Sequence, residues 1–264
     1  MMRLMETREL MFKNRQEKRM PATLRMPQDA SRGVMVMLHG LGGWKDQGVI
    51  VAAAEAACLE GYTVLTFDAA DGANGPDGAF YRATNTDYLH DLEDVISYVE
   101  REEWYREPFI LAGHSQGALV ALRYAAEYPG VAQRLILIAP AVSWTAAFLA
   151  AKGYGLAFLA WLFNWFVTGF ANWNGPNGKK LKIGRNWFFD FFKWNGRRYA
   201  KRIHVPVLIV TAERDMTVAT VEYHTRFARA FSDARHEVVP GAVHDFADHT
   251  EKITAIVRAW LTPS

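Results

Sequence analysis

The sequence predicts an α/β fold, with a mostly parallel sheet of about eight strands and helices on both faces. Short, continuously apolar runs alternate with amphipathic helical stretches along most of the 264 residues. Such runs are typical of parallel strands that are buried on both faces. The runs that predict buried strands are 34–38, 63–67, 109–112, 135–138, 207–211 and 237–239. A fold of this kind accommodates a chain of this length in one domain.

The remaining elements follow from shorter patterns. Residues 9–12 and 23–26 predict two strands around a polar turn at 14–18. Three helices are indicated by apolar residues that recur three and four positions apart, a spacing that ordinarily means core packing. These stripes are Leu89, Leu92, Ile96 and Val99, then Tyr223, Phe227, Ala230 and Phe231, and lastly Ile253, Ile256, Val257 and Trp260.

The pentapeptide Gly113-His114-Ser115-Gln116-Gly117 lies between the apolar run 109–112 and a helix-forming stretch at 118–127. In a strand, tight turn and helix, the pattern G-x-S-x-G indicates a nucleophile elbow. The turn is so sharp that both flanking positions must avoid side-chain clashes, which explains the two glycines. A serine hydroxyl is a poor nucleophile at neutral pH, so the chain must also supply a base and an orienting acid.

Both partners follow in the chain order Ser, Asp/Glu, His. Asp215 comes just after the run 207–211 and His244 just after 237–239, where open α/β sheets build their sites. Glu213 remains an alternative acid because it lies two residues earlier, on the same side of the strand end. Asp245 adjoins the histidine and would struggle to reach Nδ1 of its own neighbour. We interpret Asp248 as the N-cap of the last helix.

An oxyanion hole requires backbone N–H groups that point at the oxygen gaining charge. The strand at 34–38 ends in His39-Gly40-Leu41-Gly42-Gly43, and we place the two donors at the N–H groups of Leu41 and Gln116. His39 and His114 are interpreted as residues that orient loops through hydrogen bonds. No ligand-like spacing links the histidines and no G-x-G-x-x-G motif is present, so we expect neither a metal nor a cofactor.

These motifs together resemble those of the α/β-hydrolase fold, within the serine esterase and lipase superfamily. The resemblance covers nearly the whole chain, which within that superfamily is similar to small bacterial cinnamoyl (feruloyl) esterases and to monoacylglycerol-lipase-like hydrolases. It implies Ser115 as nucleophile, Asp215 as acid, His244 as base, and Leu41 and Gln116 as oxyanion donors. The sequence departs from these relatives at 69–78, where a Gly-rich loop replaces a G-H-G-x-S-type loop.

The strand-and-helix pattern stops at residues 141–199, which we interpret as a cap or lid inserted into a core made of 1–140 and 200–264. The insertion is rich in aromatic residues and has no charge from 153 to 178. Its aromatic residues include Trp144, Phe148, Phe158, Trp161, Phe163, Trp165, Phe166, Phe170, Trp173, Trp187, Phe188, Phe189, Phe191, Phe192 and Trp194.

The run 156–171 is shorter than the roughly 20 apolar residues of a membrane span and lies between two sheet strands. We therefore expect no transmembrane segment and favour a cap over the site, with a lipid-touching interfacial cap as the alternative. The cluster of Lys179, Lys180, Lys182 and Arg185 is interpreted as a solvated cap surface in preference to a phosphate or lipid-headgroup patch.

The net charge of +2 does not favour nucleic acid as a partner. The single cysteine, Cys58, lies in an Ala-rich stretch and is interpreted as a small buried residue. No secretory signal is recognised in residues 1–26, and the expected location is cytoplasmic.

The expected function is hydrolysis of a small to medium apolar or aromatic carboxylic ester through an acyl-enzyme, with a small-molecule ester as the partner. The alternatives are an acyltransferase, a C–C hydrolase, a haloperoxidase-like enzyme or an amidase that uses the same three residues. A non-enzymatic binding protein on this fold is disfavoured because none of the three residues Ser115, Asp215 and His244 is missing.

Overall fold

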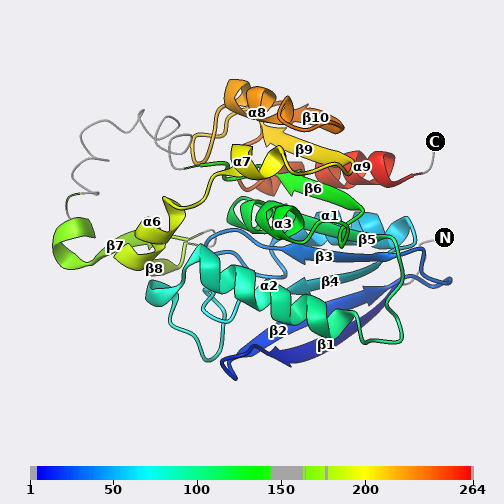
Figure 1. Cartoon of the computed structure of the whole chain (residues 1–264), viewed down its shortest axis with the longest axis horizontal. Helices are drawn as coiled ribbons and strands as arrows, with labels where there is room; N and C mark the ends of the chain where they lie inside the picture. Colours follow the sequence, from blue (N-terminus) through cyan, green and yellow to red (C-terminus); the bar gives the residue numbers. More distant parts are fainter. Residues whose placement is uncertain (1–4, 144–162, 164, 176–177, 263–264) are drawn as a thin grey trace.

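The computed structural model describes residues 5–143, 163, 165–175 and 178–262. Its main sheet has eight strands in the order β1-β2-β4-β3-β5-β6-β9-β10 (Figure 1). β2 is antiparallel to both of its neighbours, and the other adjacent pairs are parallel. The strands are β1 (Glu6–Lys13), β2 (Arg19–Met26), β3 (Val34–Leu38), β4 (Thr63–Phe67), β5 (Phe109–His114), β6 (Arg134–Ile138), β9 (Val207–Ala212) and β10 (Ala234–Val239).

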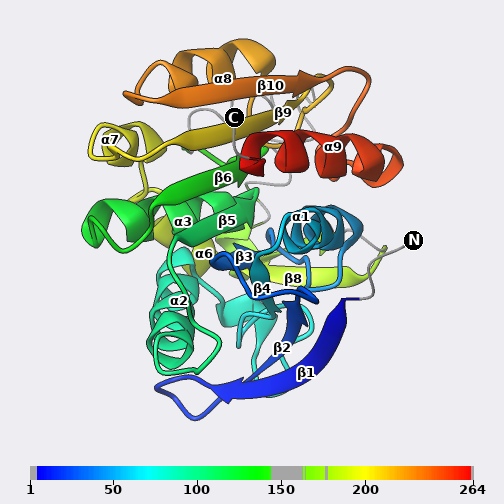
Figure 2. The ribbon, with the colours of Figure 1, turned by 90° about the vertical axis from the view of Figure 1, so that its right-hand side faces the viewer.

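Helices cover both faces of this sheet (Figure 2). One face carries α1 (Gly48–Leu59) and α9 (Thr250–Leu261), and the other carries α2 (Asn85–Val99), α3 (Gln116–Glu127), α7 (Gly196–Ala200) and α8 (Val221–Ala228). Successive side chains of a strand point to opposite faces. Along β3, Val36 and Leu38 therefore join one core cluster while Met35 and Met37 join the other. The expected α/β-hydrolase fold is confirmed.

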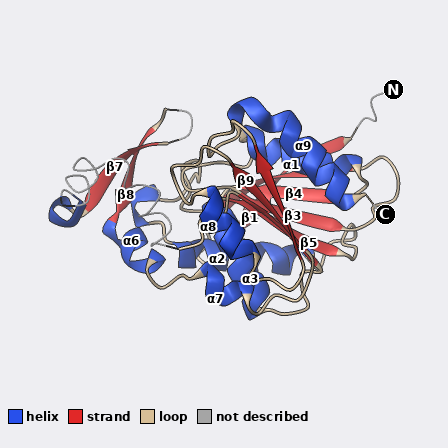
Figure 3. Cartoon of the chain, turned by 90° about the horizontal axis from the view of Figure 1, so that it is seen from above, coloured by secondary structure: helices blue, strands red, loops and turns tan. Residues whose placement is uncertain are grey.

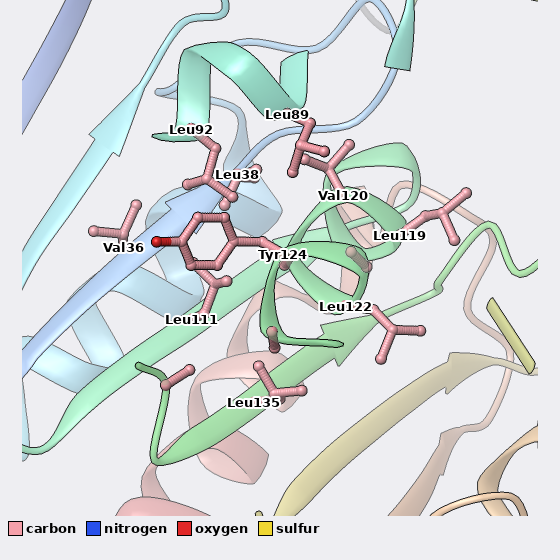
Figure 4. Packing of buried hydrophobic residues seen from close by; sticks show 14 of the residues in the cluster. Val36, Leu38, Leu89, Leu92, Leu111, Leu119, Val120, Leu122, Tyr124 and Leu135 are labelled. Atoms are coloured by element: carbon pink, nitrogen blue, oxygen red, sulfur yellow. The ribbon is translucent and has the colours of Figure 1, made fainter. Parts of the chain in front are cut away.

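The core on the α3 side is built around the ring of Tyr124, which lies among aliphatic side chains from several elements (Figure 4). Leu92 reaches it from α2, Val36 from β3 and Leu111 from β5. This packing fixes α3 against the middle of the sheet. The N-terminus of α3, where Ser115 stands, is thereby held above the ends of β3 and β5.

The predicted strand positions agree with the structure, with differences at a few ends. β10 begins at Ala234, three residues before the expected start at 237, because this edge strand leaves most of its first residues partly exposed and therefore polar. The interpretation of Asp248 was wrong. α9 begins at Thr250 with His249 at its N-cap position, and Asp248 belongs to a single 3-10 turn (Ala247–His249).

The described residues 163, 165–175 and 178–194 of the predicted cap, which we call the cap unit, lie beyond the sheet (Figure 3). β7 (Phe170–Asn174) and β8 (Lys180–Gly184) pair antiparallel and lead into α6 (Arg185–Phe191). Trp165, Ala171, Ile183 and Phe188 form its buried cluster. Trp144, Phe148, Phe158 and Trp161 lie outside the described residues.

The cap boundaries at 141–199 stay a prediction. α7 begins at Gly196, inside the predicted cap, yet it already packs against α3 of the core. Arg123 of α3 lies 4.2 Å from the Trp194 ring centre, just before α7. Among the described residues, no helix combines the length and the apolar character required to cross a membrane.

Candidate active site

The chain turns sharply at Ser115, between β5 and α3. Its backbone has φ of 55° and ψ of -117°, a conformation that L residues rarely adopt and that costs about 1–3 kcal/mol. Hydrogen bonds to β6 and to the segment that follows it hold this conformation. The Ser115 N–H donates to the carbonyl oxygen of Ile138 over 2.8 Å, and the Ala141 N–H donates to that of Ser115 over 3.1 Å. Strain held in this way is typical of functional residues.

The two glycines of the turn are required by close backbone contacts. A Cβ on Gly113 would collide with the backbone of Gly117, and a Cβ on Gly117 would collide with the carbonyl oxygen of His39. The elbow therefore packs against itself and against the loop that follows β3. The glycines of the motif are explained by these contacts, as expected from the sequence.

Ser115, His244 and Asp215 form one hydrogen-bonded chain. His244 Nε2 lies 2.9 Å from Ser115 Oγ, and His244 Nδ1 lies 2.7 Å from Asp215 Oδ2. These residues follow β5, β10 and β9, whose parallel arrangement brings their carboxyl ends to one edge of the sheet. The structure thus brings together the three side chains predicted as nucleophile, base and acid.

The Asp215 carboxylate is buried and fully engaged. Its Oδ1 accepts hydrogen bonds from the N–H groups of Thr217 at 2.8 Å and Val218 at 3.2 Å. Burial alone would raise the pKa of Asp215, but the His244 ring and these hydrogen bonds outweigh it and lower that pKa below its usual value. The carboxylate consequently stays ionised and accepts a hydrogen bond from the protonated Nδ1 of His244.

Glu213, the alternative acid, lies elsewhere. Its Oε2 accepts a hydrogen bond from the Gly241 N–H over 2.8 Å, and the side chain is exposed. The geometry therefore favours Asp215 as the partner of His244.

The loop after β3 forms a tight turn beside Ser115. The Gly43 N–H donates to the carbonyl oxygen of Gly40 over 3.0 Å, which leaves Leu41 at the second turn position, where the N–H has no acceptor within the turn. A Cβ on Gly40 would lie 3.0 Å from that of Ser115. The other expected donor, the Gln116 N–H, opens α3 and has no acceptor within that helix.

The cap unit packs against this turn. Gly42 has φ of 66°, and a Cβ there would collide with the Trp173 ring of β7. Leu41 packs against the cap cluster around Phe188. The apolar surface of the cap is thus continuous with the turn that carries one expected oxyanion donor.

His39 joins this turn to the loop after β4. Its Nδ1 donates to the carbonyl oxygen of Gly40 over 2.8 Å, and its Nε2 accepts from the Ala69 N–H over 3.1 Å. Burial lowers the pKa of His39, which keeps Nε2 free to accept. The loop starting at Ala69 is also held by Asp91 Oδ2, which accepts from the Ala70 N–H over 2.9 Å. The interpretation of His39 as a loop-orienting residue agrees with these contacts.

His114 has an equivalent contact on the other side of the site. Its Nε2 lies 2.9 Å from the backbone carbonyl oxygen of His244. A carbonyl oxygen can only accept, so Nε2 carries the ring proton. Burial, followed by the nearby His244 ring, lowers the pKa of His114 to about 3, so the ring remains neutral.

Sequence reasoning missed one buried neighbour of the site. Gln116 Nε2 donates to Asn85 Oδ1 over 2.6 Å, so the start of α2 holds the side chain of an expected oxyanion residue. Asn85 is completely buried. Its separation of 31 positions from Gln116 leaves no local pattern that could have indicated the pair.

Two expectations outside this site concern metals and Cys58. No group of three or more potential metal ligands occurs among the residues that the structure describes. Cys58 is buried on α1, and burial raises the pKa of its thiol to about 11, which leaves it protonated and unreactive at neutral pH.

Comparisons with known proteins agree with this architecture. Est1E from Butyrivibrio proteoclasticus, in a structure with ferulic acid bound, superposes with a TM-score of 0.78 at 21% identity, covering 96% of this chain and 97% of that chain. An esterase from Pyrococcus furiosus gives a TM-score of 0.72 at 18% identity, covering 97% and 91% respectively. At these identities the likeness establishes the fold alone.

A third structure, an alpha-beta serine hydrolase homologue from Coxiella burnetii, gives a TM-score of 0.67 at 17% identity, with 97% of each chain covered. A search among curated proteins found no match. The family model described as serine aminopeptidase, S33 (Hydrolase_4), matches residues 29–184, more than half of the sequence. The chain therefore belongs to the Hydrolase_4, or S33 serine aminopeptidase, family of α/β hydrolases.

Proposed function

We propose that this protein hydrolyses carboxylic esters through an acyl-enzyme formed on Ser115. The observation that carries the proposal is the hydrogen-bonded chain from Ser115 Oγ through His244 to the buried Asp215 carboxylate. An alcohol oxygen becomes an effective nucleophile when a positioned base removes its proton, and the base works best when a third group fixes its orientation.

In the first half-reaction, Ser115 Oγ attacks the ester carbonyl carbon as its proton passes to His244 Nε2. The carbonyl oxygen gains the negative charge and is stabilised by the N–H groups of Leu41 and Gln116. Asp215 stabilises the imidazolium and keeps Nδ1 protonated. When the tetrahedral intermediate collapses, the C–O bond to the alcohol breaks and His244 returns the proton to the leaving alcohol.

In the second half-reaction, water replaces the alcohol. His244 Nε2 takes a proton from the water as its oxygen attacks the acyl carbon, and the same two N–H groups hold the new oxyanion. Collapse breaks the bond to Ser115 Oγ, which recovers its proton from His244, and the carboxylic acid leaves. No external oxidant or cofactor enters the sequence.

The family name raises aminopeptidase activity as the rival function. An aminopeptidase must bind the substrate's ammonium group, ordinarily with a carboxylate. A small cavity beside the Leu41 turn is lined by Asp71, Asp87 and Asp91, among other residues. Each of the three carboxylates already bonds to groups of this chain, and Asp71 forms an ion pair with Lys18 at 2.6 Å. This arrangement favours a neutral ester.

The cap supports an apolar or aromatic substrate of small to medium size. Leu41 lies between the nucleophile turn and the aromatic cluster that contains Trp173 and Phe188. Rings of this kind offer large apolar contact surfaces to an acyl chain or a planar acid. The neighbouring Est1E structure contains ferulic acid, a planar aromatic acid, which is compatible with this proposal.

A substrate panel tests the proposal. We expect hydrolysis of p-nitrophenyl esters, with medium acyl chains or a feruloyl ester preferred over acetate, and far slower cleavage of amino-acid p-nitroanilides. Product analysis with an added alcohol acceptor separates hydrolysis from acyl transfer. Preferential cleavage of the anilides would replace the esterase proposal with an aminopeptidase, and transfer as the main outcome would identify an acyltransferase.

A further inference from the structure

Several large apolar side chains of the cap unit are exposed. Phe166, Phe189 and Phe192 are 47%, 50% and 50% exposed, although each is a large apolar side chain. Phe163 and Val167, which are 72% and 68% exposed, extend the same surface. We call these five residues the cap patch. Single exposed apolar residues are ordinary, but a contiguous group marks an interaction site.

The patch is contiguous because two helical segments contribute to it. Phe163, Phe166 and Val167 are helical and are spaced three and four positions apart, so they share one face. The Phe166 and Phe189 ring centres are 6.1 Å apart, and Phe192 lies 4.5 Å from the buried Phe188. The exposed rings therefore surround a common buried anchor.

The sequence of the predicted cap, from which this surface comes, is strongly one-sided in charge. Residues 141–199 contain eight Lys and Arg and one acidic residue, Asp190, whereas the whole chain carries a net charge of only +2. Asp190 is buried and accepts hydrogen bonds from Thr86 and Trp194. Arg185 and Lys193, at the two ends of the segment that carries Phe189, are exposed.

From this combination we infer that the cap patch docks on the surface of an anionic phospholipid bilayer. Phenylalanine rings enter the boundary between headgroups and acyl chains, while neighbouring arginine and lysine side chains pair with anionic headgroups. A second copy of the chain fits less well, because a symmetric contact would bring two cationic surfaces together. On this inference the exposed basic side chains contact lipid headgroups, in contrast to the solvated cap surface expected from the sequence.

The patch is connected to the proposed active site through a buried ring. Phe188 anchors the patch and belongs to the cluster that packs against Leu41. Docking would therefore place the Leu41 turn close to a source of apolar esters. That consequence rests on the proposed function, whereas the binding itself does not.

Co-sedimentation of the full chain with vesicles tests the inference. We expect binding to vesicles of phosphatidylcholine that contain phosphatidylglycerol, and at least tenfold weaker binding to phosphatidylcholine alone. Salt at about 1 M, where the screening length falls to about 3 Å, should weaken the first interaction. Equal binding to both compositions, or binding to neither, would overturn the inference.

Two double variants separate the contributions of rings and charges. Phe189→Ser with Phe192→Ser should weaken binding by on the order of tenfold or more through lost apolar burial. Arg185→Gln with Lys193→Gln should weaken it by about fivefold for each charge, with anionic vesicles only. Met11→Ser is the matched control, because Met11 is 56% exposed on β1, outside the cap unit. Wild-type binding by both double variants would contradict the assignment to the cap patch.

Further measurements keep the two proposals distinct. Ser115→Ala should bind vesicles as the wild type does even though we expect it to be inactive. Hydrolysis of a water-soluble ester should be unchanged in Phe189→Ser with Phe192→Ser, which also shows that the variant is folded. A dimer in solution that dissociates in this double variant would identify a second copy as the occupant and overturn the lipid assignment.

Discussion

The His114 ring donates a hydrogen bond from Nε2 to the backbone carbonyl oxygen of His244 over 2.9 Å. The residue before the proposed nucleophile therefore holds the backbone of the proposed base. The loop that carries His244 also has hydrogen bonds of its own. Phe246 is buried with φ of 53°, and its N–H donates to the carbonyl oxygen of Val243 over 3.1 Å. We expect His114 to act as a positioning residue for His244.

This role predicts different effects for two substitutions of His114. His114→Leu removes the donor and should lower kcat by about tenfold to a hundredfold with little change in KM, because displaced catalytic groups slow the chemical step. His114→Gln can place an amide donor at the same reach and should recover much of that loss. Steady-state kinetics on one ester checks both. Equal kcat values for the two variants would show that the hydrogen bond has no positioning role.

A second prediction concerns the orienting acid. Asp215→Asn should lower kcat by several orders of magnitude, because the amide no longer stabilises the imidazolium or its tautomer. Glu213→Gln is the matched control and should keep nearly wild-type activity, since its carboxylate accepts from the Gly241 N–H instead. Activity of both variants is compared on the same ester. A larger loss in Glu213→Gln would reverse the assignment.

The elbow glycines give a prediction about stability. Gly117→Ala places a methyl group against the carbonyl oxygen of His39 and should cost about 3 kcal/mol in the free energy of unfolding. Gly130→Ala is the control, because Gly130 has φ of 92° with nothing within 4 Å of its added Cβ. That substitution should cost about 1 kcal/mol, from backbone conformation alone. Urea unfolding measures both values, and equal losses would argue against the close contact.

A buried histidine away from the proposed chemistry gives a pH prediction. His224 Nε2 donates to the carbonyl oxygen of Pro140 over 2.9 Å, and its Nδ1 lies 3.1 Å from Thr211 Oγ1. Burial lowers the pKa of His224 to about 4. Between about pH 6.5 and pH 4 the unfolded chain binds the proton and the folded chain does not, so stability falls as the pH falls.

The contribution of His224 amounts to about 2 kcal/mol of unfolding free energy between pH 7 and pH 5. His224→Gln should flatten the pH dependence of that free energy in this window, although it lowers stability at pH 7. His204→Gln, at an exposed position, is the matched surface control. Urea unfolding at the two pH values makes the comparison. An unaltered pH dependence in His224→Gln would contradict the buried neutral imidazole.

The strands that position the site could be predicted because a strand buried on both faces has a continuous run of apolar residues in the sequence. β3 and β5 are buried along their whole length, and β3 and residues 109–112 of β5 are unbroken apolar runs. β10 lies at the edge of the sheet, where half-exposed polar residues such as Arg235 break that pattern. Sequence reasoning therefore found its end, which leads into the loop that carries His244, and missed its start.

Contacts between distant segments could not be predicted in the same way. The pairing of Asn85 with Gln116 depends on how α2 packs beside α3. No sequence pattern around either residue indicates this pairing. The exposure of Phe189 and Phe192 is a similar case. The sequence predicted an aromatic cap over the site, and the packing of α6 around Phe188 leaves these two rings half exposed.

The most direct test of the proposed nucleophile is covalent labelling with a fluorophosphonate, which phosphonylates an activated serine. Intact and peptide mass spectrometry should find one adduct per chain on Ser115, with fluoride as the leaving group, and none on Ser115→Ala. His244→Gln should react far more slowly, because the base that removes the serine proton is absent. An adduct on another residue, or ester hydrolysis that persists in Ser115→Ala, would contradict the central claim.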